Sequence, residues 1–233
     1  MKKIITTICI SAGLALSTFA QNAPIDFESG GNGANWTWTV FENSTNPAVE
    51  IIANPDMTGA NTSATVMKFT ALKAGKSYAG CESKRGTTDL GKFSWDATNR
   101  TVKIMVWKPV ISDVGIKFVS DSGWAEPEVK VANTKVNEWE ELTFDFSGKI
   151  NPPANQGMLS QIAIFPDFQA RAGDNICYVD NVTFSTGGSS LAEPTMAATT
   201  PTYDSADVIS MFSNAYTDVT VETWRTSWSS GTV

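Results

Sequence analysis

The clearest secondary-structure signal in the chain reads Glu141-Leu142-Thr143-Phe144-Asp145-Phe146. Apolar and polar side chains alternate strictly along it, so one face of the segment is apolar and the other is polar. This period of two is typical of a half-buried β-strand, because successive side chains of a strand point to opposite faces. We therefore predict a strand here, with Leu142, Phe144 and Phe146 directed into a core.

Outward from this segment the same alternation returns at residues 65–71, 100–107, 114–119, 161–165 and 176–184. Turn-forming residues stand between these segments, as in Asn54-Pro55-Asp56 and Asn151-Pro152-Pro153. No long stretch has a convincing helical period. Many short strands separated by turns predict an all-β fold, a β-sandwich or jelly roll, built as one domain over residues 21–185.

The first 20 residues have the composition of a cleavable export signal. Lys2 and Lys3 precede an apolar run over residues 4–16, and small residues at Thr18 and Ala20 predict cleavage before Gln21. The alternative is a membrane anchor, but an anchor needs about 20 apolar residues, more than this run contains. We expect an exported protein, secreted or at the cell surface, without a membrane span.

The C-terminal part of the chain changes character twice. Residues 186–202 are rich in Gly, Ser, Thr, Ala and Pro and carry one charge, Glu193, which is typical of a linker. Residues 203–233 are again apolar and aromatic, but they are too few to build a core of their own. We interpret them as the start of a second, incomplete module.

Composition excludes several classes of function. The 24 acidic residues outnumber the 17 basic ones and give a net charge of −7. Without a basic cluster, nucleic acids and anionic membranes are poor partners, and solubility is the simpler reason for the acidity. Because the chain has no histidine, it cannot build a Ser-His-Asp or Cys-His nucleophile or a histidine-ligated metal centre.

Cys81 and Cys177 are the two cysteines of the expected mature chain. An exported protein meets an oxidising compartment, so a disulfide between them is allowed. Their spacing does not say whether they meet, so a disulfide and two free thiols both stay open. Two cysteines without any histidine make a poor zinc site.

Carboxylate catalysis, as in glycosidases, needs two acidic side chains held roughly 5–10 Å apart across a cleft. The acidic residues lie in loops or alternate outward on predicted strands, without a dense acidic motif on one strand. We therefore interpret them as solvent-facing and expect no enzyme activity from the residues present. The candidates considered are Glu126, Glu128, Glu138, Glu140 and Asp145.

Eight tryptophans are many for a chain of this length. Trp36, Trp38 and Trp124 stand in Gly- and Asn-rich surroundings that indicate loops or strand ends. Sugar rings have apolar faces that stack on aromatic planes, and their hydroxyls need polar partners, so exposed tryptophans suit a glycan. Core packing is the alternative, because tryptophan is highly buried on average. We prefer core packing for Trp139 and ligand contact for Trp124.

The two ends of the predicted domain carry acidic residues at Glu28 and Asp180. If the first and last strands are neighbours, these carboxylates meet, and they repel unless a cation lies between them. Ca²⁺ is the natural cation outside the cell, and Asn61 offers a further oxygen ligand. The alternative is that the carboxylates cap turns and never meet.

With these residues in view, residues 24–184 resemble the jelly-roll carbohydrate-binding modules of families 4, 9, 16 and 22, found on secreted bacterial glycan-degrading proteins. The resemblance lies in Phe27-Glu28, in Asn137-Glu138-Trp139-Glu140 before the strand quoted first, and in Tyr178-Val179-Asp180. It implies a galactose-binding-like β-sandwich with a structural calcium at Glu28, near Asn61 and at Asp180. The chain departs from these families in having no cleft histidine and in placing Cys81 in the strand of Tyr78.

The resemblance also implies a glycan cleft, with stacking aromatic side chains and polar partners. The expected cleft residues are Tyr78, Trp124, Glu126, Phe165, Gln169 and Arg171. Residues 207–228 resemble a segment that follows such modules in surface glycan-binding proteins and some laminarinases, which suggests a β-glucan ligand.

We thus expect a monomeric, non-catalytic protein that binds a polysaccharide of the β-glucan type. One alternative is the N-terminal accessory part of a laminarinase-like glycoside hydrolase whose catalytic domain is missing from this sequence. Another is an adhesive cell-surface sandwich that binds protein.

Overall fold

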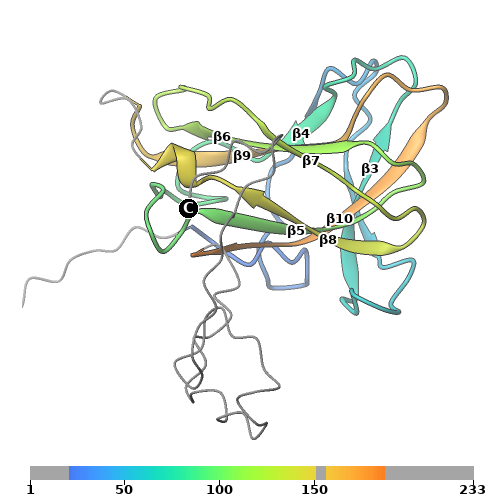
Figure 1. The fold of residues 1–233 in the computed structure, drawn as a ribbon, viewed down its shortest axis with the longest axis horizontal. Helices are drawn as coiled ribbons and strands as arrows, with labels where there is room; N and C mark the ends of the chain where they lie inside the picture. The colour runs from blue at the N-terminus through green and yellow to red at the C-terminus, as the bar shows by residue number, and fades with distance from the viewer. Residues whose placement is uncertain (1–20, 151–155, 187–233) are drawn as a thin grey trace, which may run out of the picture. The chain divides into compact units, whose positions relative to one another are not determined.

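The computed structural model describes residues 21–150 and 156–186, which hold ten β-strands and one short 3₁₀-helix (Figure 1). The predicted export signal and second module, and nearly all of the predicted linker, lie outside the described residues. In chain order the elements are β1 (Thr39–Phe41), β2 (Glu50–Ala53), β3 (Thr65–Ala71), β4 (Gly80–Glu82), β5 (Thr101–Trp107), β6 (Asp113–Ser120), β7 (Val129–Ala132), β8 (Trp139–Asp145), η1 (Ser147–Lys149), β9 (Leu159–Phe168) and β10 (Asn175–Ser185).

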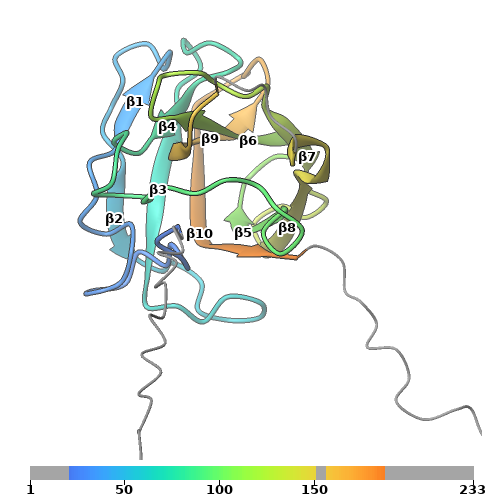
Figure 2. The same ribbon diagram turned by 90° about the vertical axis from the view of Figure 1, so that its left-hand side faces the viewer.

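The strands form two antiparallel five-stranded sheets. The first sheet has the order β1-β4-β9-β6-β7, and the second has the order β2-β3-β10-β5-β8. Figure 2 shows the two sheets as separate layers. Since sequence-distant strands are neighbours in both sheets, the predicted all-β sandwich of jelly-roll type is confirmed.

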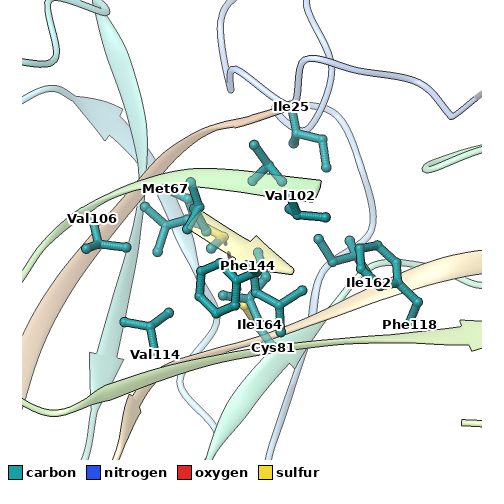
Figure 3. Close-up of a cluster of buried hydrophobic side chains, with 14 of the residues drawn as sticks. Ile25, Met67, Cys81, Val102, Val106, Val114, Phe118, Phe144, Ile162 and Ile164 are labelled. Atoms are coloured by element: carbon teal, nitrogen blue, oxygen red, sulfur yellow. Dashed lines mark hydrogen bonds between the residues drawn. The ribbon is translucent and has the colours of Figure 1, made fainter. Parts of the chain in front are cut away.

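The core lies between the two sheets and follows the alternation read from the sequence. Val102, Ile104 and Val106 of β5 are at most 2 % exposed, and Phe144 of β8 is fully buried. Figure 3 shows apolar side chains of both sheets gathered in this space. Trp139 is 3 % exposed, so its predicted burial is confirmed, but it packs in a second, smaller cluster with Val66 and Met105 rather than between the sheets.

The N-terminal segment pairs with β10, the central strand of the second sheet. Ile25 pairs with Val182 of β10 in an antiparallel bridge, with N–H to O distances of 2.9 Å in both directions. The first and last parts of the domain are therefore neighbours. This pairing decides where Glu28 and Asp180 lie.

Cys81 and Cys177 are free thiols in the structure, so the disulfide that the sequence allowed does not form. Cys81 belongs to β4 of the first sheet and Cys177 to β10 of the second. Cys81 packs with its sulfur 4.0 Å from that of Met67, and both cysteines are fully buried. Burial raises the pKa of Cys177 to about 12 and moves the pKa of Cys81 in the same direction.

Within residues 21–150 and 156–186, no helix is long and apolar enough to cross a membrane.

Candidate ligand-binding face and terminal carboxylate cluster

Glu28, Asn61 and Asp180, the three predicted calcium ligands, come together at the junction of the N-terminal segment with β10. Asn61 donates its amide N–H to Asp180 Oδ2 over 2.8 Å, although 119 residues separate the two in sequence. Burial raises the pKa of Asp180, and the negative charge of Glu28 acts in the same direction. The two carboxylates are thus close enough to influence each other.

Each carboxylate of this cluster is already satisfied by protein donors. Glu28 accepts hydrogen bonds from the backbone N–H groups of Ala64 (2.6 Å) and Thr65 (3.0 Å), which lower its pKa. Asp180 accepts from Asn61 and from the backbone N–H of Asn181. Among the described residues, no group of three or more His, Cys, Asp or Glu side chains forms a metal cluster.

The donor set nevertheless fits a hard cation. It offers two carboxylates, the amide oxygen of Asn61 and the hydroxyl of Thr65, which are the oxygen ligands that Ca²⁺ prefers. Any cation has to compete with the N–H donors that now satisfy the carboxylates. A metal role for these residues therefore stays a prediction.

The predicted cleft residues do not form one cleft, because they lie at two ends of the first sheet. Trp124 and Glu126 follow the last residue of β6, Ser120, which pairs with Leu159 at the start of β9. Gln169 and Arg171 follow the end of β9, where Phe168 pairs with Asp113. The eight residues of β6 separate these ends by roughly 23 Å.

Glu126 is 2 % exposed and lies in the interior, so it is not available to a ligand. Trp95 donates its indole N–H to Glu126 Oε1 over 2.7 Å, and Gln156 Nε2 lies 3.5 Å from the same oxygen. Burial raises the pKa of Glu126 to about 7. Trp124 is half-buried in the adjoining turn.

Arg171 is also buried, and its partner is Asp167 rather than a ligand. Its Nε lies 3.0 Å from Asp167 Oδ2, Nη1 donates to the carbonyls of Leu72 and Lys76, and Nη2 donates to the carbonyl of Asp167. Gln169 Nε2 donates to Asp167 Oδ1 over 3.0 Å. These contacts tie the β3–β4 connection to the β9–β10 connection, which is a structural role.

Asp167 is the centre of this network. Burial acts to raise its pKa, but hydrogen bonds from Ser112 and Asn175 and the charges of Lys108 and Arg171 lower it overall. Lys108, 1 % exposed, lies 3.8 Å from Asp167 Oδ1 and donates to the backbone oxygen of Ser112. The carboxylate therefore stays charged in the interior.

Phe165 belongs to an aromatic row on the outer face of the first sheet, which we call the aromatic platform: Phe41, Phe165 and Phe168. The Phe41 and Phe165 rings pack edge to face with centroids 5.5 Å apart, and Phe165 and Phe168 are 5.4 Å apart. Lys130 Nζ lies 4.5 Å from the Phe168 ring centre. Phe41 and Phe168 are half-buried, whereas Phe165 is 3 % exposed between them.

Glycines under the platform let the rings lie close to the sheet. A Cβ at Gly115 would stand 3.1 Å from Phe165 and 3.2 Å from Phe168. A Cβ at Gly80 would stand 2.9 Å from the Phe41 ring. The local sequence therefore fixes the position of the rings from below.

A row of polar groups lies beside the platform on the same face. Glu82 of β4 and Lys117 of β6 both pair with Ala163 of β9, so the three side chains stand level across three adjacent strands. Among the described residues, neither Glu82 nor Lys117 has a side-chain hydrogen bond or an ion pair. The Glu82 carboxylate and the Lys117 ammonium group, which lies 5.5 Å from the centre of the Phe165 ring, thus flank a small alanine.

The outer face of the second sheet also carries aromatic side chains, but its charges are already paired. Trp107 and Tyr178 pack edge to face with centroids 5.2 Å apart, over a small apolar cluster. The neighbouring Lys68–Glu50 and Lys103–Glu141 pairs have 2.7 Å contacts. These four charged side chains are therefore already paired with one another.

Sequence reasoning found Phe165 and missed the rest of the face. Phe41 lies in a three-residue strand, too short for alternation to stand out. Phe168 follows a β-bulge opposite Asp113 and Gly115, which brings Phe165 and Phe168 to the same face against the period of two. Tyr78, the other predicted aromatic, is 43 % exposed before β4 and takes no part in the platform.

No protein-family model matches this chain, and no curated protein matches it either. Similar solved structures include an alanine mutant of CBM29-2, a family 29 carbohydrate-binding module, with a TM-score of 0.42 and 13 % identity over 73 % of this chain and 94 % of that one. An exo-β-agarase has a TM-score of 0.48 and 10 % identity over 70 % of this chain and 25 % of that one. An arabinose-bound α-L-arabinofuranosidase has a TM-score of 0.47 and 13 % identity over 72 % and 26 %. All three scores are below 0.5, so the fold assignment rests on the strand order itself.

Proposed function

We propose that this protein binds a polysaccharide on the outer face of the first sheet and does not cleave it. The observation that carries the proposal is the unpaired Glu82 and Lys117 side chains beside the aromatic platform. Aromatic ring faces offer apolar area to the C–H faces of sugars. Sugar hydroxyls both donate and accept hydrogen bonds, so one carboxylate and one ammonium group satisfy both functions.

The floor of this face suits a ligand that lies flat across the strands. Gly80 and Gly115 let the platform rings lie against the sheet, and Ala163, between Glu82 and Lys117, adds no side chain that projects beyond the rings. The opposite charges of Glu82 and Lys117 cancel, which favours a neutral glycan over an acidic one. A neutral β-glucan, the ligand suggested by the sequence resemblance, is the finer form of the proposal.

Calorimetry and affinity electrophoresis with soluble β-1,3-glucan, mixed-linkage β-glucan, xylan and mannan test the proposal. We expect Phe168→Ala and Lys117→Ala each to weaken binding by about tenfold, ~1.4 kcal/mol. Trp107→Ala, on the second sheet, is the matched control and should bind as the parent does. The proposal fails if none of the four glycans binds, or if the control weakens binding as much as Phe168→Ala.

We propose non-catalytic binding because the acidic residues of this face do not form a catalytic pair. Glu82 stands level with Lys117, Asp113 lies four residues from Lys117 along β6, and Glu126 is buried away from the platform. A glycosidase places two carboxylates across the scissile bond, roughly 5–10 Å apart. Incubation of the four glycans with the protein should therefore release no reducing ends.

We also propose a structural Ca²⁺ at Glu28, Asp180 and the amide oxygen of Asn61. The support is the convergence of these oxygen ligands where the N-terminal segment meets β10. Such an ion offsets the repulsion between two carboxylates and links the two ends of the domain. Export, predicted from residues 1–20, supplies a compartment where Ca²⁺ is available, and N-terminal sequencing of the secreted protein should begin at Gln21.

A further inference from the structure

A polar pocket of about 290 Å³, open to solvent, lined by exposed residues and called the cavity below, begins one residue after Phe41, the first ring of the aromatic platform. It lies between the β1–β2 and β3–β4 connections. Its lining residues are Glu42, Ser44, Asn46, Ala74 and Lys76. Because this volume lies at the lower end of the range for ligand pockets, it suits a small ligand.

The cavity wall is built from strained backbone. Glu42, Ser44 and Asn46 have φ angles of +55°, +60° and +49°, in the left-handed region. Asparagine adopts this region readily, whereas glutamate and serine seldom do. Such strain persists only where the surroundings enforce it, and it clusters at ligand sites.

Asn43 is what enforces it. This side chain is fully buried, donates to the carbonyl of Thr70 over 2.7 Å and accepts from the N–H of Leu72 over 2.8 Å. Its own N–H donates to Asn46 Oδ1 over 2.8 Å, and the N–H of Lys76 donates to the carbonyl of Glu42 over 2.8 Å. The two connections are thus held together around the cavity before any ligand arrives.

The polar groups of the wall decide the class of ligand. Glu42 accepts hydrogen bonds and Lys76 donates them, and neither side chain has a partner among the described residues. The carboxylate disfavours an anion such as phosphate, and the ammonium group disfavours a metal cation. The Ser44 hydroxyl donates and accepts, so the wall as a whole matches neutral vicinal hydroxyls.

We infer that this cavity binds one neutral sugar residue, as the end or a side branch of a glycan that lies on the platform. The inference rests on the proposed function, because Phe41 joins the two surfaces. The platform then holds the apolar faces of the glycan along its length, and the cavity reads the hydroxyls of a single residue. Specificity for a chain end or a branch follows from the cavity and not from the platform.

Two-dimensional ¹H–¹⁵N spectra of the labelled protein test this with D-glucose, D-galactose, D-mannose, D-xylose and L-arabinose as probes. At least one sugar should shift the amide signals of residues 42–46 and 74–76 in a concentration-dependent way. Combined Glu42→Gln and Lys76→Met should weaken that binding by about tenfold or more, since hydrogen bonds to two charged groups are lost. Lys73→Met, in the same connection but outside the cavity wall, is the matched control and should leave it unchanged.

Linear and branched gluco-oligosaccharides then separate the two surfaces. Signals of Lys117, Phe165 and Phe168 report the platform, and those of residues 42–46 report the cavity. The cavity assignment is overturned if no monosaccharide shifts its signals, or if the shifts survive the double substitution, even when the platform signals respond. If the cavity signals shift while the platform signals do not, the proposed function is overturned and the cavity alone is a monosaccharide site. A response of the cavity to branched but not linear chains assigns it to a branch, and the reverse assigns it to a chain end.

Discussion

Trp95 donates its indole N–H to Glu126 Oε1 over 2.7 Å, and both side chains are at most 4 % exposed. Glu126 Oε2 and Gln156 Oε1 are also buried, and neither has a hydrogen-bond partner in the described part of the chain. A proton on Glu126 Oε2 turns this atom from an unsatisfied acceptor into a donor. The geometry and the raised pKa of about 7 therefore agree on a carboxyl that is readily protonated.

Stability should fall as the pH rises through this titration. The pKa of Glu126 is about 7 in the folded protein and 4.5 in the unfolded chain. Between these two pH values the folded state therefore binds one proton that the unfolded state has lost. The carboxyl stabilises fully below pH 4.5 and loses that contribution as the pH rises to about 7, for ~3 kcal/mol in all. Urea unfolding of the parent and Glu126→Gln from pH 4 to pH 8 measures it. The difference between the two curves should change across this window, and parallel curves would contradict the assignment.

Arg171→Ala should destabilise the protein and leave glycan affinity unchanged in the folded fraction. The substitution strips the fully buried Asp167 of a charged partner, and breaking a buried pair in this way costs roughly 3–5 kcal/mol. Lys103→Ala breaks an exposed pair with Glu141 and should cost under about 1 kcal/mol. Urea unfolding compares the two. A selective loss of glycan binding in stably folded Arg171→Ala would restore the ligand role that the sequence suggested.

Gly115→Ala should weaken glycan binding by lifting the platform rings. The added Cβ stands 3.1 Å from Phe165 and 3.2 Å from Phe168, so both rings have to shift by a few tenths of an ångström. Overpacking of this kind typically costs about 1–3 kcal/mol of stability. Gly148→Ala, which meets nothing within 4 Å, is the control for adding a methyl group. Equal glycan affinities of Gly115→Ala and Gly148→Ala in calorimetry would contradict a role of the platform in binding.

Chelation should lower the melting temperature if Ca²⁺ occupies the terminal carboxylate cluster. An ion present at a hundred times its Kd contributes about 2.7 kcal/mol, which corresponds to roughly 5–10 °C. Asp180→Asn should abolish the response to EGTA, while Asp145→Asn, an exposed residue on β8, should retain it. Scanning calorimetry measures the melting temperature with Ca²⁺ and with EGTA. Equal melting temperatures of the parent protein under the two conditions would contradict Ca²⁺ binding at this cluster.

Glycan binding should leave the tryptophan fluorescence nearly unchanged, because the platform consists of phenylalanines. The sequence pointed instead to Trp124, which is half-buried in the turn after β6. Emission spectra during a glycan titration distinguish the two surfaces. A shift that disappears in Trp124→Phe would move the binding site to that turn.

The strands with strict alternation were predictable because their faces depend only on local sequence. Leu142, Phe144 and Phe146 are buried as predicted, and the segment predicted at residues 100–107 forms β5. The meeting of Glu28 with Asp180 was also predictable, since it follows from pairing the first and last parts of one sandwich. In each case a short-range pattern or a simple topological rule carries the information.

The binding face was not predictable in the same way. Whether Glu126 faces a ligand or the interior depends on Trp95, and whether Arg171 is free depends on Asp167 and two carbonyls before β4. Phe41, Glu82 and Lys117 lie on three strands whose order in the sheet no local pattern reveals. Burial of polar loop residues and strand order are both set by contacts between distant segments.

The two buried thiols have a practical consequence for work with this domain. Thiolates, not thiols, attack alkylating reagents and disulfides, and Cys81 and Cys177 stay protonated and covered at neutral pH. The described domain needs no oxidant to fold, so it can be produced in a reducing cytoplasm. A single cysteine placed at an exposed position such as Lys84 then becomes the one reactive handle among the described residues, and a fluorophore attached there can follow ligand capture without first removing the native cysteines.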